Sequence, residues 1–259
     1  MTRFAKLSGA GNDFILIQDV GRPVSPASAR RLCDRREGVG ADGVLLVRPG
    51  GSRRPHRVRY LNADGSRAFC GNGTRCAAWW LSAAGAGKRL ELDTDAGIVE
   101  AVVAGPGRVR VRMPPPHGLR LGLRLAAGGR RWTVHAVDTG VPHAVIVSRA
   151  VSRLDLASVG PALRRHRAFG AAGANVDLVE PLGRGSFALR TFERGVEAET
   201  LACGTGAVAA AVVLETLGLG RLPARFRTRG GHALVVQREA GELWLEGPAR
   251  IVFTGEVVL

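Results

Sequence analysis

The sequence predicts an α/β protein (α+β) with two pseudo-symmetric domains, each a mixed, mostly antiparallel sheet wrapped around one central helix. A chain of 259 residues is near the size at which a single core divides in two. Short β-type stretches outnumber helical ones, and a pattern of strand, Cys-Gly-x-Gly and helix occurs at 57–81 and again at 187–214. A repeat separated by about half the chain is typical of an internally duplicated fold.

The first half contains more strand-like than helical segments. The expected helices lie near 27–36, with Ser25 as N-cap and Pro26 at the first position, and near 71–84. A Pro-Pro-Pro-His-Gly stretch at 114–118 is the expected linker between domains. The expected strands lie at 14–20, 43–49, 57–62, 90–104 and 108–114.

The second half has the same character, with helices expected near 156–167 and 204–217 and Gly218 as a left-handed stop. We expect an N-terminal domain at 1–116, on which a C-terminal strand at 249–259 packs, and a second domain at 117–248. The expected strands lie at 130–140, 143–148, 175–182, 187–193, 224–229, 232–239 and 242–259.

Cys70 and Cys203 begin the two repeated helices and are the candidate catalytic residues. A thiol at a helix N-terminus lies near unpaired N–H groups and the positive end of the helix dipole, which lower a thiol pKa from about 8.5. Two such thiols could remove a proton from one side of a carbon and deliver one to the other. Free cysteines are more often small buried apolar groups, and Cys33 and Cys76 are interpreted in that way.

Composition excludes several classes of protein. The apolar fraction of 46% supports a real core, and no apolar run reaches the length of a membrane span. The first residues lack the basic and long apolar regions of a signal peptide, so we expect none. Four cysteines in a chain of this length fit a reducing cytoplasm. The net charge of +15 comes from scattered arginines, and 5% aromatic residues are too few for base stacking, so we expect no specific nucleic-acid partner.

No cofactor or metal is expected. The G-x-G-x-x-G pattern at 38–43 has a helix before it and a strand after it, the reverse of a dinucleotide site. The histidines form no HExxH and the cysteines no CxxC. Pyridoxal phosphate needs a Schiff-base lysine, and Lys6 and Lys88 lie in no recognisable cofactor setting.

Six sequence blocks in order resemble the diaminopimelate epimerase family over essentially the whole chain. The resemblance implies a cofactor-independent epimerase of lysine and peptidoglycan-precursor biosynthesis that converts LL-diaminopimelate to the meso form. It also implies a homodimer and an active site in the cleft between domains. The blocks are KLSGAGNDF (6–14), GVGADG (38–43), YLNADGSRAFCGNGTRC (60–76), TGVPHAV (139–145), GANVDLVE (173–180) and TFERGVEAETLACGTGA (191–207).

The chemistry of inversion at an amino-acid α-carbon requires a base on one face and an acid on the other, with stabilisation of the charge that develops. Cys70 and Cys203 fill the two proton-transfer roles. The reacting carboxylate would bind backbone N–H groups at the starts of the two helices. These groups belong to Gly71, Asn72, Gly204 and Thr205.

Other site residues follow from the resemblance alone. Asn12, Asn62, Asn175 and Arg194 match positions that hold the distal amino-acid group, where Arg194 would grip a carboxylate in a bidentate fork. His143 and Glu193 match positions beside the thiols, where they tune protonation or contact the substrate's amino group. All of these except Glu193 also have a simpler interpretation: the asparagines as turn residues, Arg194 as a surface charge, and His143 as a hydrogen-bonded residue after Pro142.

Two positions depart from the family pattern. Val141 stands where many members have an asparagine, and Gly43 where they have a glutamine. The resemblance therefore defines the type of reaction better than it defines the substrate. A two-thiol proline or hydroxyproline racemase is the nearest alternative. A noncatalytic RNA-binding protein would need a localised basic face and would not depend on either cysteine.

Overall fold

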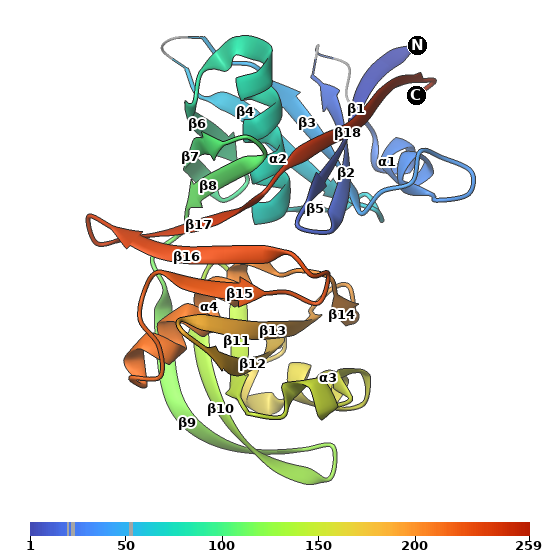
Figure 1. Cartoon of the computed structure of the whole chain (residues 1–259). Coiled ribbons are helices and arrows are strands. Elements are labelled where there is room, and N and C mark those ends of the chain that lie inside the picture. The colour runs from blue at the N-terminus through green and yellow to red at the C-terminus, as the bar shows by residue number, and fades with distance from the viewer. Residues whose placement is uncertain (20, 22–23, 52–53) are drawn as a thin grey trace. The chain divides into compact units, whose positions relative to one another are not determined.

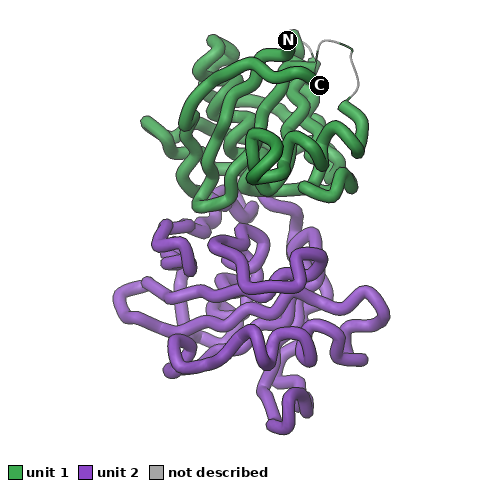
Figure 2. The backbone as a smooth tube through the Cα atoms, turned by 90° about the vertical axis from the view of Figure 1, so that its right-hand side faces the viewer, with its two compact units in different colours: residues 1–112, 246–259 green, residues 113–245 purple. Residues whose placement is uncertain are grey.

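The computed structural model describes residues 1–19, 21, 24–51 and 54–259 and divides the chain into two compact units (Figure 2). Unit 1 contains Met1–Arg112 and Glu246–Leu259, and unit 2 contains Met113–Leu245. These limits lie within a few residues of the expected domain limits, which stay a prediction.

Unit 1 is a mixed sheet in which strand order follows β18, β1, β2, β3, β4, β6, β7 and β8, with the short β5 also on β4. Only the β2–β3 and β4–β6 pairs are parallel among these. Its elements are β1 Thr2–Gly9, β2 Asn12–Gln18, α1 Pro26–Cys33, β3 Gly43–Arg48, β4 His56–Asn62, β5 Arg67–Ala68, α2 Gly71–Leu81, a following π-helical turn Ser82–Ala86, β6 Arg89–Thr94, β7 Gly97–Gly105, β8 Arg108–Arg112 and β18 Arg250–Val257.

Unit 2 repeats this arrangement, with β9, β10, β11, β12, β13, β15 and β16 paired in that order and β14 also on β13. Its elements are β9 His117–Ala127, β10 Arg130–Asp138, β11 Pro142–Val147, the 3₁₀ turn Val151–Arg153, α3 Leu156–Arg164, the 3₁₀ turn Arg167–Phe169, β12 Asn175–Gly183, β13 Ser186–Glu193, β14 Ala198–Thr200, α4 Gly204–Thr216, β15 Ala224–Arg227, β16 Ala233–Glu239 and β17 Glu242–Pro248, which runs across the unit boundary.

The two units are related element by element. In each unit, one helix, called here the outer helix, connects two parallel strands. The outer helix of unit 1 is α1, which connects β2 to β3, and that of unit 2 is α3, which connects β11 to β12. A second helix, called here the inner helix, lies in the sequence between the strands of a second parallel pair. The inner helix of unit 1 is α2, between β4 and β6, and that of unit 2 is α4, between β13 and β15. The expected pseudo-symmetric α/β fold is therefore confirmed.

The inner helices form the centres of their units. Strands of unit 1 surround α2, which contacts β1, β2, β3, β4, β6, β7, β8 and β18 (Figure 1). The α4 helix is built from Gly, Ala, Val and Leu over most of its length and is buried on all sides, as expected of a helix with no polar face. Each inner helix starts directly after its Cys-Gly-x-Gly cysteine, so the sheet fixes the position of that thiol within the unit.

The structure corrects several expected segments. The stretch expected as one strand at 90–104 is the hairpin β6–β7, turned by Gly97 with φ 93°, and the stretch at 242–259 is divided into β17 and β18. The strands β1, β5, β9 and β14 were not expected, and β9 begins inside the segment expected as a linker. The strand expected at 14–20 begins earlier, at Asn12, and its last residue, Val20, lies outside the described residues.

Buried charge explains why β1 gave no strand signal. Lys6 interrupts its apolar run, yet the residue is only 7% exposed because its ammonium forms an ion pair with Asp13 at 2.7 Å and donates to the Gly40 carbonyl. Burial is the largest single influence on the pKa of Asp13 and raises it. The hydrogen bonds and charges of Arg35 and Lys6 together outweigh burial and lower this pKa to about 2. Lys6 therefore stabilises the fold beside the start of β2.

We predict that truncating the α4 core destabilises the protein. Leu214 is fully buried, so Leu214→Ala should reduce the free energy of unfolding by about 2–5 kcal/mol through lost burial and a residual cavity. Leu219 is 53% exposed just beyond the helix, so Leu219→Ala should change it by less than about 0.5 kcal/mol. Urea unfolding of both variants measures the difference, and equal effects would contradict the central placement of α4.

Candidate active site

Cys70 is the N-cap of α2. Its backbone is extended, with φ −133° and ψ 108°, and its Sγ accepts a long hydrogen bond from the Gly73 N–H at 3.4 Å. The Cys70 carbonyl accepts from the Thr74 N–H and hydroxyl. The residue is partly exposed, and its sulfur is held by the backbone of the first helical turn.

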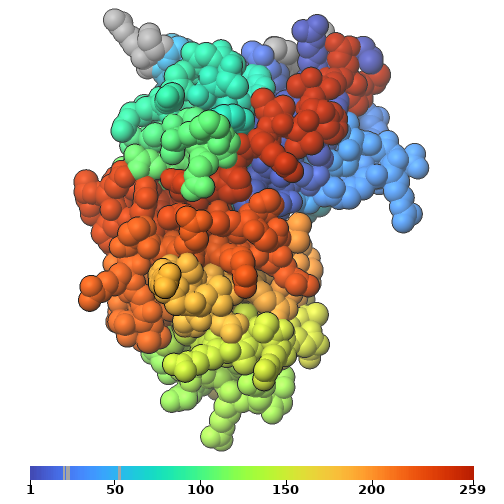
Figure 3. Space-filling model, in the orientation of Figure 1, coloured from blue at the N-terminus to red at the C-terminus, as the bar shows by residue number. Residues whose placement is uncertain are grey.

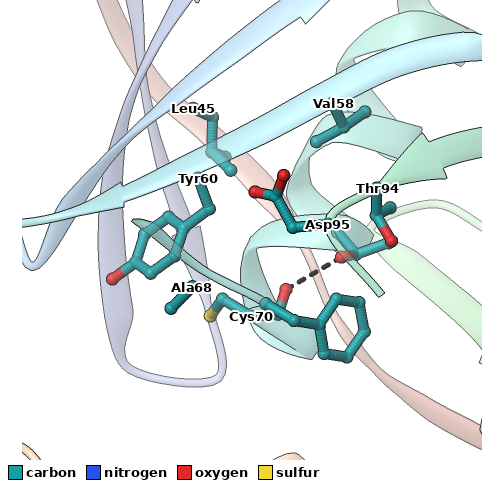
Figure 4. Close-up of a pocket in the computed structure, with 9 residues that line it drawn as sticks. Leu45, Val58, Tyr60, Ala68, Cys70, Thr94 and Asp95 are labelled. Carbon is teal, nitrogen blue, oxygen red and sulfur yellow. Dashed lines mark hydrogen bonds between the residues drawn. The ribbon is translucent and has the colours of Figure 1, made fainter. Parts of the chain in front are cut away.

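A small cavity adjoins Cys70, between the first turn of α2 and the sheet (Figure 4). Its volume is about 10 Å³, which is about the space of one water molecule and far below that of an amino acid. It is lined by Leu45, Val58, Tyr60, Ala68, Phe69, Cys70, Thr74, Thr94 and Asp95. The cavity is therefore too small to hold an amino-acid substrate.

Asn12 and Asn72 lie together at this end of unit 1. The Asn72 amide donates to Asn12 Oδ1 at 2.5 Å, and Asn12 Nδ2 donates to Asp42 Oδ2 at 3.0 Å. Asn62 is engaged elsewhere, in the turn after β4, where its side chain donates to Ser66 Oγ at 2.9 Å. Of the asparagines expected in unit 1, two thus share one network and the third stabilises a local turn.

The departure at Gly43 has a local cause. A Cβ atom at this position would lie 2.3 Å from the ring of Tyr60 and 2.5 Å from the carbonyl oxygen of Leu61. The Tyr60 hydroxyl donates to the Asp42 carbonyl at 3.2 Å, which holds the ring there. Tyr60 therefore fills the space that a glutamine side chain at position 43 would need.

Cys203 occupies the equivalent N-cap of α4, with φ −120° and ψ 112°. Its Sγ accepts from the Gly206 N–H at 3.4 Å and lies 3.4 Å from the Thr205 hydroxyl. The residue is only 6% exposed, and Glu193 forms a hydrogen bond with it. Burial above all, and then the carboxylates of Glu193 and Asp177, raise the pKa of the Cys203 thiol well above its usual value.

Glu193 ends β13 with part of its surface exposed, yet its carboxyl group points into the protein. Burial raises the pKa of that carboxyl, opposed by its hydrogen bonds to Cys203 and Thr200. The group can therefore hold a proton at a higher pH than an exposed glutamate. This is a property that suits a neighbour of a proton-transferring thiol.

His143 and Asp177 form a fully buried pair on the adjacent strands β11 and β12. His143 Nδ1 lies 2.6 Å from Asp177 Oδ2, and the Thr191 hydroxyl donates to Asp177 Oδ1 at 2.7 Å. A carboxylate is an acceptor, so His143 must carry a proton on Nδ1 and, when neutral, a lone pair on Nε2. Asp177 thus fixes the tautomer and the orientation of the imidazole.

The glycine at position 206 is required by this pair. A Cβ there would lie 2.3 Å from Asp177 Oδ1 and 3.3 Å from the Cys203 sulfur. The Asp177 carboxylate therefore lies directly against the first turn of α4, where the partial positive charge of the helix N-terminus stabilises it. Histidine, aspartate and thiol are thereby held in one place in unit 2.

Asn175 joins this cluster at the start of β12. Its Nδ2 lies 3.5 Å from His143 Nε2, too long for a strong hydrogen bond, and its Oδ1 accepts from the Arg194 backbone N–H at 2.8 Å. Among the described residues, the Arg194 guanidinium has no hydrogen bond or ion pair, and the side chain is half-buried. Its charge is thus available to an anion.

Asp177 is the functional residue that sequence reasoning missed. The signal was present, because an aspartate inside the apolar segment Val176–Val179 must find a partner if the strand is buried. Thr139 was also overlooked; its hydroxyl donates to the Thr205 carbonyl at 3.0 Å and ties the start of α4 to the β10–β11 turn. Val141 follows in that same turn, with its carbonyl accepting from the Thr139 N–H.

The remaining cysteines have no comparable setting. Cys33 and Cys76 are buried, and burial raises the pKa of Cys33 to about 11 and that of Cys76 to about 12. In the ranges 1–19, 21, 24–51 and 54–259, no helix is long and apolar enough to cross a membrane. The same residues contain no group of three or more His, Cys, Asp or Glu side chains that could hold a metal ion.

Solved structures share this fold. The chain superposes on a PhzF-family phenazine biosynthesis protein of Bacillus anthracis with a TM-score of 0.76 at 14% identity, covering 100% of this chain and 99% of that one. A probable proline racemase of Agrobacterium radiobacter K84 gives 0.72 at 16% identity, with 100% and 93% covered. These likenesses show that the chain has the same two-domain fold as these structures.

Sequence comparison defines the family. The diaminopimelate epimerase family pattern matches residues 4–118 and 135–252. The chain is 39% identical to the diaminopimelate epimerase of Chlorobaculum tepidum, over 98% of this chain and 100% of that protein, and 36% identical to that of Aquifex aeolicus, over 98% and 97%. The chain belongs to the diaminopimelate epimerase family, and it is an isomerase of the epimerase class.

We predict that Glu193→Gln stabilises the fold increasingly as pH rises. The native pKa of Glu193 is raised, so the native state keeps this proton to a higher pH than the unfolded chain, whose glutamates titrate near about 4.3. The wild type therefore loses stability relative to the glutamine variant between the two pKa values. Thermal unfolding at pH 4.5 and pH 8 measures this; a variant that gains nothing at pH 8 would contradict the burial of the carboxyl.

We predict that Asp177→Asn lowers kcat of the epimerase by about tenfold or more, because an amide holds the His143 Nδ1 proton less firmly than a carboxylate. Thr191→Val is the matched control, since it removes the second hydrogen bond to Asp177 and leaves the charge in place. Steady-state kinetics with circular dichroism of each variant measure the effect. A larger loss in Thr191→Val than in Asp177→Asn would show that packing, and not the Asp177 charge, matters here.

Proposed function

We propose that the protein interconverts LL-2,6-diaminopimelate and meso-diaminopimelate without a cofactor, using Cys70 and Cys203 as a thiolate and thiol pair. The observation that carries the proposal is the same local geometry at both thiols. Each cysteine caps the inner helix of its unit, and each sulfur accepts a glycine N–H at 3.4 Å. Membership of the diaminopimelate epimerase family supports the substrate.

The reaction needs two proton transfers at one carbon. The thiolate takes the α-proton, leaving an electron pair that spreads into the adjacent carboxylate, and the other thiol returns a proton to the opposite face. Each turnover exchanges the protonation states of Cys70 and Cys203, because the thiolate becomes a thiol and the thiol becomes a thiolate. The reverse reaction therefore starts with the thiolate on the other cysteine. No oxidant or reductant is required, because a proton is the only species exchanged.

The two environments support unequal resting states. Burial and the neighbouring carboxylates favour the neutral thiol at Cys203 in the free enzyme. Cys70 is partly exposed and its sulfur accepts a helix N–H. We therefore assign the acid role to Cys203 and the base role to Cys70 in the first turnover of the free enzyme.

Binding of the substrate is assigned to two groups of residues. The reacting carboxylate takes the N–H groups of Gly71, Asn72, Gly204 and Thr205, which start the two helices. The distal amino-acid group takes Asn12, Asn62, Asn175 and Arg194, and Glu193 contacts the substrate's amino group. The half-buried guanidinium of Arg194, which has no partner among the described residues, supports a bidentate grip on the distal carboxylate. His143 and Glu193 tune the protonation of the thiols.

The family also suggests the setting of the reaction. We propose that the protein works in the cytoplasm, in lysine and peptidoglycan-precursor biosynthesis, where the thiols stay reduced. We further propose a homodimer. Strand β18, which belongs to the red surface in Figure 3, contains exposed apolar residues that a second copy could cover. Among them, Val252 is 51% exposed and Phe253 is 48% exposed. Analytical ultracentrifugation across a range of concentrations measures the assembly.

A racemase acting on proline or hydroxyproline is the second candidate. Its support is the shared fold, since one of the similar structures is described as a hydroxyproline epimerase from Agrobacterium vitis, with a TM-score of 0.69 at 17% identity. The departures at Gly43 and Val141 also remove side chains that many family members have. Stereochemical turnover of LL- and meso-diaminopimelate, L-proline and trans-4-hydroxy-L-proline, without added cofactor, separates the candidates. Turnover of the proline substrates alone would overturn the proposal.

We predict that Cys70→Ala and Cys203→Ala each abolish epimerisation while circular dichroism stays unchanged, because one acid/base group cannot serve both faces of the α-carbon. Cys33→Ala and Cys76→Ala are the matched controls and should keep most of the activity. An inactive, folded Cys33→Ala or Cys76→Ala protein would show that the catalytic roles are wrongly assigned.

A further inference from the structure

Arg75 is a fully buried arginine in the second turn of α2. It is 0% exposed, and among the described residues its Nε and Nη1 groups have no hydrogen-bond partner. Burial lowers the pKa of its guanidinium to about 10, so the group is still a cation at neutral pH. A buried arginine normally pairs with a carboxylate. A buried arginine without one indicates that its charge contributes to function more than to stability.

The guanidinium lies at the level of the first turn of α2. Side chains on a helix point back toward its N-terminus, and the Arg75 Nη2 group donates to Asn72 Oδ1 at 2.5 Å, three residues earlier. Its electrostatic partners are the thiols of Cys76 and Cys70. The positive charge therefore adds to the N–H groups and the helix dipole at the same end of α2.

Arg75 also determines the orientation of two asparagines. A guanidinium only donates, so Asn72 must present its oxygen to Arg75 and its amide N–H to Asn12 Oδ1 at 2.5 Å. Asn12 must then present its amide N–H to Asp42, at 3.0 Å, because a carboxylate only accepts. A cation at one end and an anion at the other fix the direction of the whole chain of hydrogen bonds.

We propose that Arg75 is a positioning residue that makes the N-terminus of α2 a binding site for a carboxylate. Its buried cation supplies the charge that a bound carboxylate balances, and its hydrogen bond holds Asn72 and Asn12 in one orientation. The inference rests on the proposed function in that the carboxylate is the reacting one of the amino-acid substrate. Arg75 acts through these groups and does not itself touch the reacting atoms.

The test compares alkylation of Cys70 by the anion iodoacetate and by neutral iodoacetamide, mapped by peptide mass spectrometry on the full chain at one pH. The ratio of the two rates reports the charge around the thiol and needs no substrate. In the folded wild type it should exceed the ratio at Cys70 in the urea-unfolded protein. Arg75→Gln, which keeps an amide donor and removes the charge, should lower it about tenfold.

Two variants serve as controls. Arg75→Lys keeps the charge and should keep most of the iodoacetate preference. Arg108→Gln removes one arginine of the same unit, at the partly exposed Glu246 ion pair, and should leave the ratio unchanged. Because a neutral group replaces a buried and incompletely paired charge, Arg75→Gln should be at least as stable to heat as the wild type.

The outcomes separate this inference from the proposed function. An unchanged ratio in Arg75→Gln, a wild-type ratio no higher than that of the unfolded chain, or an Arg75→Gln protein that unfolds would each overturn it, the last by showing that the guanidinium holds the fold. If diaminopimelate is not turned over while Arg75→Gln still loses the iodoacetate preference, the substrate assignment fails and the anion site stands.

Discussion

The placement of a cysteine at the N-terminus of each inner helix, enclosed by its sheet, is the constraint on which the chemistry of this structure depends. The first N–H groups of a helix have no partner within it, and oxygen-bearing side chains are the usual caps. Cys70 and Cys203 are weaker caps, each with a sulfur 3.4 Å from a glycine nitrogen. The surrounding sheets, more than the caps, must therefore hold α2 and α4 in place.

The repeat places two thiols in the same backbone geometry and in different electrostatic surroundings. Cys203 lies in a buried cluster with Glu193, His143 and Asp177, which favours its neutral form. In unit 1, α2 itself carries a buried cation, Arg75, whose guanidinium donates to Asn72. Duplication thus supplied the framework, and the side chains around the two thiols differ in charge.

Much of this could be predicted from the sequence, for physical reasons. The caps at Cys70 and Cys203, the largely apolar helix α4 and the stop at Gly218, with φ 68°, each depend on local sequence. Features that depend on tertiary contacts could not be predicted. Only the fold shows that Asp177 holds His143 or that Lys6 is neutralised by Asp13. Likewise, only the structure shows Asn62 in a local turn and Tyr60 in the space beside Gly43.

The central claim is that one thiol removes the α-proton and the other delivers a different one. The most direct measurement follows deuterium at the α-carbon during the first few per cent of reaction of LL-diaminopimelate in deuterium oxide. Two separate acid/base groups predict deuterium in the meso product while recovered LL-substrate still carries hydrogen. Deuterium entering recovered substrate as fast as product, or product that keeps the original hydrogen, would show a single base and contradict the account.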